Sequence, residues 1–190
     1  MKAQRHAWCQ WAAGSDLDRL VFVDETGAKT NMTRSHGRAE KGRRVVDHAP
    51  HGHWQTTTLL GAVRRDGFTA SMVVDGPTDA DVFQAYLEQV LVPCLRPGHL
   101  VILDNLSPHK TPAVAAAIRA AGAEVMFLPP YSPDLNPVEQ MWSKVKAYLR
   151  KVKARTLDTL IEAIRQALAS VTAADVEGWF GYCGYVTIRS

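Results

Sequence analysis

Three short apolar runs constrain the fold of this chain more than any other feature of its sequence. They are RLVFVDET at 19–26, GHLVILDN at 98–105 and AEVMFLPP at 123–130. Short runs rich in Val, Leu, Ile and Phe are typical of strands that are buried on both faces. A helical pattern separates the second run from the third, and strands that alternate with helices pair in parallel. The sequence therefore predicts an α/β fold.

The segments between these runs complete the predicted sheet and its covering helices. TTTLLGAV at 56–63 and FTASMVVD at 68–75 flank the turn signal RRDG and predict a β-hairpin. Helical spacing of apolar residues predicts helices within 1–14, 78–95, 110–122, 137–153 and 156–171. We therefore expect a mixed five-stranded sheet flanked by helices, with a long loop or weak hairpin over residues 27–55.

Composition excludes several classes of protein. The 190 residues suffice for one compact domain. No apolar run approaches the length of a membrane span and the N-terminus lacks an apolar signal region, so we expect a cytoplasmic protein. Cys9, Cys94 and Cys183 are far apart, which argues against a disulfide framework or a structural zinc site. The net charge of +3 permits a nucleic-acid partner without requiring one.

Two of the apolar runs end in an aspartate, Asp24 and Asp104. Ligands of open α/β sheets gather beyond the carboxyl ends of strands, so these side chains are candidates for one shared site. Aspartate also ends many strands without any further role, and Glu25, next to Asp24, points to the opposite face. Asn105 and His109 follow Asp104. The histidine is either a proton shuttle or phosphate contact, or part of a solvated helix N-terminus.

The proline-rich stretch FLPPYSPDLNPVEQMW at 127–142 contains two further acids, Asp134 and Glu139. Asn136, Pro137 and Glu139 fit the N-cap, first and third positions of a helix, and Glu at the third position completes a capping-box pattern. Asp134 fits the turn before the helix, where it can accept bonds from backbone donors. The residue types therefore allow Glu139 to be a capping residue or a functional acid.

Taken together, VDETG, ILDNLSPHK and LPPYSPDLNPVEQMWSKVK resemble the catalytic domain of DDE-type transposases. The pattern is similar to the bacterial insertion-sequence branch of the mariner-like superfamily, and it covers roughly residues 20–155. Between Asp104 and Glu139 lie 34 residues, a spacing typical of that superfamily. The resemblance implies a ribonuclease H-like fold and an acidic triad of Asp24, Asp104 and Glu139, with Asn105 and His109 as auxiliary residues.

An acidic triad of this kind suits phosphodiester cleavage. Two divalent ions about 3.5–4 Å apart can clamp the attacking and leaving oxygens, and Mg²⁺ takes oxygen ligands such as carboxylates. We therefore expect two Mg²⁺ or Mn²⁺ ions at Asp24, Asp104 and Glu139, with Asp24 bridging them. The resemblance implies hydrolysis and strand transfer at transposon ends, double-stranded DNA as the partner, and a homodimer.

Two groups of basic residues flank the acids and are candidate contacts for DNA phosphates. Residues 141–155 contain no acid, which is unusual for a plain surface helix. The candidates are Arg34, Arg38, Lys41, Arg43, Arg44, Lys110, Lys144, Lys146, Arg150 and Lys151.

We expect residues 20–170 to form the catalytic domain, with residues 1–19 as an N-terminal helix and linker and residues 171–190 as a tail that packs on the domain. Members of the family usually carry helix-turn-helix units ahead of this domain, and 19 residues are too few for one. The sequence therefore predicts either a separate helix-turn-helix protein or a missing N-terminal domain. It also leaves open a truncated, non-enzymatic DNA-binding remnant that keeps the fold.

Overall fold

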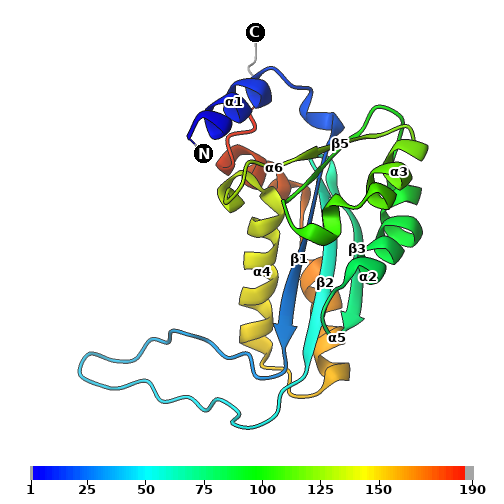
Figure 1. Ribbon diagram of the computed structural model, residues 1–190. Coiled ribbons are helices and arrows are strands. Elements are labelled where there is room, and N and C mark those ends of the chain that lie inside the picture. Colours follow the sequence, from blue (N-terminus) through cyan, green and yellow to red (C-terminus); the bar gives the residue numbers. More distant parts are fainter. Residues whose placement is uncertain (1, 187–190) are drawn as a thin grey trace.

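The computed structural model describes residues 2–186, and this part of the chain forms a five-stranded mixed sheet with helices on both faces (Figure 1). The strand order is β3-β2-β1-β4-β5. β1 pairs antiparallel with β2, as β2 does with β3, whereas the β1–β4 and β4–β5 pairs are parallel. The predicted hairpin and mixed sheet are confirmed. The strands are β1 (Leu20–Lys29), β2 (Thr56–Arg64), β3 (Gly67–Asp75), β4 (Leu100–Leu103) and β5 (Glu124–Phe127).

Alternate residues of β1 enter two separate cores, one on each face of the sheet. Phe22 packs with α4, α5 and α6, whereas Val21 and Val23 pack with α2 and α3. Because side chains alternate along a strand, Asp24 shares the face of Phe22 and points toward α4. The helices are α1 (Lys2–Ala13), α2 (Ala80–Tyr86), α3 (Pro112–Ala120), α4 (Pro137–Val152), α5 (Leu157–Ala169) and α6 (Ala173–Tyr182).

The structure differs from the sequence prediction in three elements. β5 was expected to be buried, but it is the edge strand: Glu124 is exposed and the next three residues are half-buried. The helix predicted over 78–95 is α2 followed by a π turn at Leu87–Leu91 and a 3₁₀ turn at Val92–Cys94. The predicted tail contains α6, which begins with a capping box formed by Thr172 and Asp175.

Two buried aromatic residues of the C-terminal region, Phe180 of α6 and Tyr185 after it, contact β1. Phe180 and Tyr185 are buried and pack against Phe22 of β1, with ring centroids 5.5 and 4.9 Å from it. The predicted tail also includes residues 187–190, which lie outside the described range.

A long exposed loop between β1 and β2 extends away from the body of the molecule (Figure 1). It is tied to the C-terminal end of α4 by the Lys153–Asp47 ion pair, 2.5 Å between Nζ and Oδ2. Arg155 also donates to the carbonyl oxygens of Thr30 and Met32, at 2.9 and 3.0 Å. The predicted long loop is therefore confirmed, although its first three residues belong to β1. No helix within residues 2–186 is long and apolar enough to cross a membrane.

Candidate active site

Three acids that are distant in the sequence border one pocket of about 400 Å³. Asp24 comes from β1, Asp104 directly follows β4, and Glu139 lies in the first turn of α4. β1 and β4 are parallel neighbours, so Asp24 and Asp104 lie on adjacent strands, at and just beyond the same end of the pair. Asn105 also lines the pocket, whereas His109 and Lys110 are not among its lining residues.

Asp24 is the most buried of the three acids, with 7% of its surface exposed. Its Oδ2 atom has no hydrogen-bond partner among the described residues. Burial raises the pKa of Asp24 well above its ordinary value, and repulsion from Glu139 and Asp104 adds to this effect, against a backbone hydrogen bond from Glu25. The site thus favours either a proton on Asp24 or a cation beside it.

Asp104 is held in one orientation by two donors. The Nδ1 atom of His109 lies 2.5 Å from Asp104 Oδ1, and the Leu106 N–H donates to the same oxygen at 3.0 Å. Partial burial opposes ionisation, but the His109 hydrogen bond and the Leu106 N–H outweigh it and lower the pKa of Asp104 below its ordinary value. Both contacts fall on Oδ1, so Oδ2 is the oxygen left for a ligand.

His109 is 1% exposed, so it is not part of a solvated helix N-terminus, which was one of the two interpretations of its sequence position. Its ring lies 4.0 Å from the ring of Phe83 in α2, measured between centroids. An ionised carboxylate only accepts hydrogen bonds, so the Nδ1 atom is protonated and donates this hydrogen bond to Asp104. The Nε2 atom has no hydrogen-bond partner in the described part of the chain. His109 therefore acts on the pocket through Asp104.

Glu139 does not act as the capping residue that its position suggests. Asn136 is the N-cap of α4, and its side chain accepts from the Val138 N–H at 3.3 Å. The second half of a capping box would bring the Asn136 N–H to the Glu139 carboxylate, but that N–H donates to Pro133 O at 3.0 Å. The carboxylate instead lies at the pocket, where the N-terminal end of a helix stabilises negative charge.

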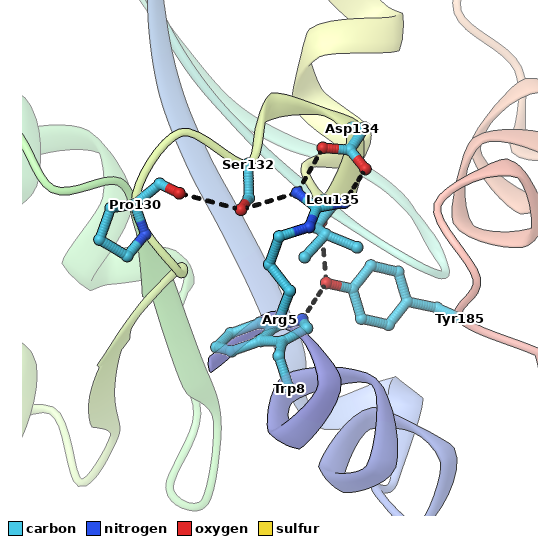
Figure 2. A network of polar contacts seen from close by, with 7 residues as sticks. All are labelled: Arg5, Trp8, Pro130, Ser132, Asp134, Leu135 and Tyr185. Carbon is cyan, nitrogen blue, oxygen red and sulfur yellow. Dashed lines mark hydrogen bonds and ion pairs between the residues drawn. The ribbon is translucent and has the colours of Figure 1, made fainter. Parts of the chain in front are cut away.

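The loop that leads into α4 is held from both ends of the chain (Figure 2). Arg5 of α1 donates to both carboxylate oxygens of Asp134, at 2.8 and 2.5 Å, and to Ser132 Oγ at 2.8 Å. The Tyr185 hydroxyl donates to Leu135 O at 2.8 Å and accepts from the indole N–H of Trp8 at 2.9 Å. The sequence prediction missed this network, because its partners lie 50 to 177 residues apart.

Asp134 is thereby separated from the acids of the pocket. The hydrogen bond from Arg5 lowers the pKa of Asp134 below its ordinary value, against a small opposing effect of burial. Its charge is compensated by the guanidinium group, and it is not among the residues that line the pocket. Asp134 lies in the turn before α4, as its sequence position suggests.

The sequence that forms this fold matches a known family. Residues 19–161 match the model of the DDE superfamily endonuclease family. The chain belongs to this family.

Two curated relatives of this DDE endonuclease domain are transposases of Caenorhabditis briggsae. The transposable element Tcb1 transposase is 28% identical over 124 residues, which cover 63% of this chain and 42% of the relative. The Tcb2 transposase is 23% identical over 108 residues, 55% of this chain and 40% of the relative. The chain thus spans less than half the length of the curated relatives it matches.

Solved structures confirm the predicted ribonuclease H-like fold of the DDE endonuclease domain. A pre-cleavage Mos1 transpososome is similar with a TM-score of 0.80 and 17% identity, over 96% of this chain and 58% of that one. The catalytic domain of the Mos1 mariner transposase is similar with a TM-score of 0.67 and 15% identity, over 96% of this chain and 85% of that one.

The three acids of the DDE endonuclease domain are the candidate ligands for a metal ion. Within residues 2–186, no three His, Cys, Asp or Glu side chains are already grouped around one ion position. The donor set is nevertheless all-oxygen, and the Oδ2 atom of Asp24 is buried without a partner. These residues fit a divalent ion such as Mg²⁺ or Mn²⁺.

The basic candidates of the DDE endonuclease domain occupy different surroundings. Arg34, Arg38, Lys41, Arg43 and Arg44 are exposed in the long loop, where Arg43 lies 3.4 Å from Glu40. Lys144 is engaged within the protein: its Nζ donates to Ser170 O at 2.9 Å and pairs with Asp175 at 2.5 Å. Lys146 and Arg150 are half-exposed on α4 and Lys151 is exposed. At 1.5 Å per residue, Arg150 lies roughly 16 Å along α4 from Glu139.

Proposed function

We propose that this domain is the catalytic part of a metal-dependent DNA transposase, which hydrolyses phosphodiester bonds at transposon ends and transfers the resulting ends to new DNA. The observation that carries the proposal is the convergence of Asp24, Asp104 and Glu139 on one pocket from three separate elements. The family assignment to DDE endonucleases and the transposase relatives support it. Within the mariner-like proteins we assign the chain to the bacterial insertion-sequence branch, acting in the cytoplasm.

The three acids would hold two Mg²⁺ or Mn²⁺ ions, with Asp24 between them. Asp24 is the acid that interacts electrostatically with both others, which supports a bridging role. The Mos1 paired-end complex has been solved with Mn and with Mg. Such ions lower the pKa of a bound water or hydroxyl and stabilise the leaving oxygen. The protein's own part is to orient the ligands: His109 fixes Asp104, and Asn136 fixes the start of the helix that carries Glu139.

Double-stranded DNA would reach this pocket along the basic surfaces. The exposed loop arginines and lysines, together with Lys110, Lys146, Arg150 and Lys151, would contact phosphates without reading sequence. Lys144 is a weaker candidate, since its charge is paired with Asp175. Pairing of two transposon ends would take place in a homodimer, and end recognition would come from a separate helix-turn-helix protein or an N-terminal domain. We propose residues 20–170 as the catalytic domain, with residues 1–19 and 171–190 as its N-terminal and C-terminal flanking segments.

Metal-dependent nicking tests the proposal. Supercoiled plasmid is incubated with the protein in Mg²⁺, in Mn²⁺ and in EDTA, and conversion to the nicked circle is measured by gel electrophoresis. We expect nicking with either ion, none in EDTA, and loss in Asp104→Asn. Asp158→Asn is the matched control, because Asp158 is exposed on α5. Equal nicking by wild type and Asp104→Asn would refute the triad, and an inactive wild type would favour a DNA-binding remnant.

A further inference from the structure

The lining of the pocket includes apolar residues whose presence the acids do not explain. Besides the acids and other polar residues, apolar residues line it: Leu106, Leu128, Pro129, Pro130, Tyr131 and Pro133. Two of them, Leu106 and Tyr131, are exposed by 45% and 90%. Large apolar side chains at the rim of a polar pocket favour a ligand that has an apolar face as well as a charged group.

The backbone of Tyr131 is held in a conformation that bulky residues avoid. Its φ is 53°, and among the described residues Lys153, with φ 57°, is the other non-glycine residue with positive φ. Lys153 is the C-cap of α4, where a left-handed residue is common. Tyr131 caps no helix. A left-handed aromatic residue is strained, and such strain is typical of ligand-binding sites.

The surrounding contacts keep this loop rigid. Ser132 Oγ donates to Pro130 O at 3.2 Å and accepts from Arg5 at 2.8 Å (Figure 2), so both sequence neighbours of Tyr131 take part in hydrogen bonds. The Asn105 side chain donates to the carbonyl oxygen of Leu128 and so connects the segment of Leu106 to the segment of Tyr131. Tyr131 as a whole is 90% exposed, so the loop fixes its backbone while its side chain stays open to solvent within the described part of the chain. This is the arrangement of a preorganised binding surface.

We propose that Tyr131 and Leu106 form a subsite for an unpaired nucleobase next to the phosphate that metal ions held by the acids would bind. This inference rests on the proposed function. A nucleotide carries a phosphate and a flat aromatic base together, which matches a pocket lined by both acids and apolar residues. An aromatic ring stacks on any base, so the subsite holds the end of a strand in place without reading its sequence. A paired base is stacked within the duplex, so the subsite takes bases at frayed, flipped or single-stranded positions.

A fluorescence experiment tests this subsite directly. The probe is a short duplex with a single-stranded 3′ overhang that carries 2-aminopurine, whose fluorescence is quenched by stacking. All proteins carry Asp104→Asn, so that the DNA stays intact. We expect quenching with Tyr131 and with Tyr131→Phe, and its loss with Tyr131→Ala, together with a roughly 5- to 150-fold weaker affinity for the overhang. Tyr182→Ala is the matched control, since Tyr182 is 73% exposed on α6 and is not among the pocket-lining residues.

The variant Tyr131→Gly separates a functional role from a structural one. Glycine tolerates positive φ, so we expect a higher midpoint of thermal unfolding together with the loss of quenching. A lower midpoint, or equal quenching in Tyr131 and Tyr131→Ala, would overturn the subsite. Plasmid nicking by proteins with intact Asp104 is measured separately. Nicking without any quenching of the overhang would therefore overturn the subsite and leave the proposed function standing.

Discussion

The position of α4 against the sheet sets the distance between two of the acids, and Gly61 controls it. Gly61 of β2 lies opposite Asp24 of β1 and faces Trp142 of α4, the helix that carries Glu139. A Cβ at position 61 would meet the Trp142 ring at 2.7 Å and the Met141 methyl group at 3.1 Å. Carbon atoms prefer a separation of about 3.5–4.0 Å, so Gly61→Ala must move the helix by roughly 1 Å.

This displacement has a cost in stability and a larger one in activity. Trp142 is 1% exposed and has no room to move aside, so overpacking should cost about 1–3 kcal/mol. The lower flexibility of alanine in the unfolded chain offsets about 0.5–1 kcal/mol of this. Glu139 moves with the helix while Asp24 stays in the sheet. A misplacement of about 1 Å can lower activity about 100-fold, so nicking should fall much more than stability.

Guanidinium unfolding and metal-dependent plasmid nicking measure the two effects of Gly61→Ala. Gly178→Ala is the control, because a Cβ at position 178 meets open space in α6, and we expect unchanged or slightly higher stability there. Trp142→Phe removes the ring atoms that clash. The double variant of Gly61 and Trp142 should therefore be less destabilised than the sum of the single variants. Full stability and full nicking in Gly61→Ala would refute the argument that this contact positions α4.

Three further predictions concern charge and capping. The pKa of Asp24 is raised in the folded protein, so protonated Asp24 stabilises the metal-free fold at low pH. This stabilisation is lost as the pH rises from about 4, the ordinary pKa of aspartate, through the folded-state pKa. Asp24→Asn has no such pH-dependent loss, so in EDTA at neutral pH its melting temperature should be higher than that of the wild type. Asn136→Ala should lower the free energy of unfolding by about 1 kcal/mol and Asn136→Ser by less, measured in urea. Lys144→Met should lower the melting temperature, because it breaks the contact to Asp175, without changing the salt dependence of DNA binding. Lys146→Met should keep the melting temperature and reduce the salt slope by about 1.

Local patterns were sufficient to predict most of the fold. The apolar runs predicted β1, β4 and β5, and the spacing of apolar residues predicted α4 within one residue at its C-terminal end. The exposure of β5 could not be predicted, because a central strand and an edge strand covered by a helix can have the same apolar sequence pattern. α6 was missed although Thr172 and Asp175 carry its capping box, a signal of the type that marks helix starts. The glycines and aromatic residues that follow this capping box favoured an irregular tail instead.

The surroundings of the site residues depend on contacts that no local pattern records. The sequence left open whether His109 belongs to a solvated helix N-terminus or acts at the site. Phe83, which precedes it by 26 residues, packs against its ring and excludes the first interpretation. Tyr185 reaches Leu135 across 50 residues, and Arg5 reaches Asp134 across 129. Residue types and spacing can therefore predict which acids are candidates. Which neighbours orient or neutralise them follows from the folded chain.

Asp134 and Glu139 show how the fold assigns different roles to two acids of one short stretch. Arg5 compensates the charge of Asp134 outside the pocket, so this carboxylate adds nothing to the repulsion that Asp24 experiences. The Asn136 N–H bonds to Pro133 O, and the Glu139 carboxylate therefore has no capping bond to make. Its charge contributes to the raised pKa of Asp24. One acid thus fixes the loop, whereas the other lines the same pocket as Asp24, and this closeness of two carboxylates supports the proposed metal site.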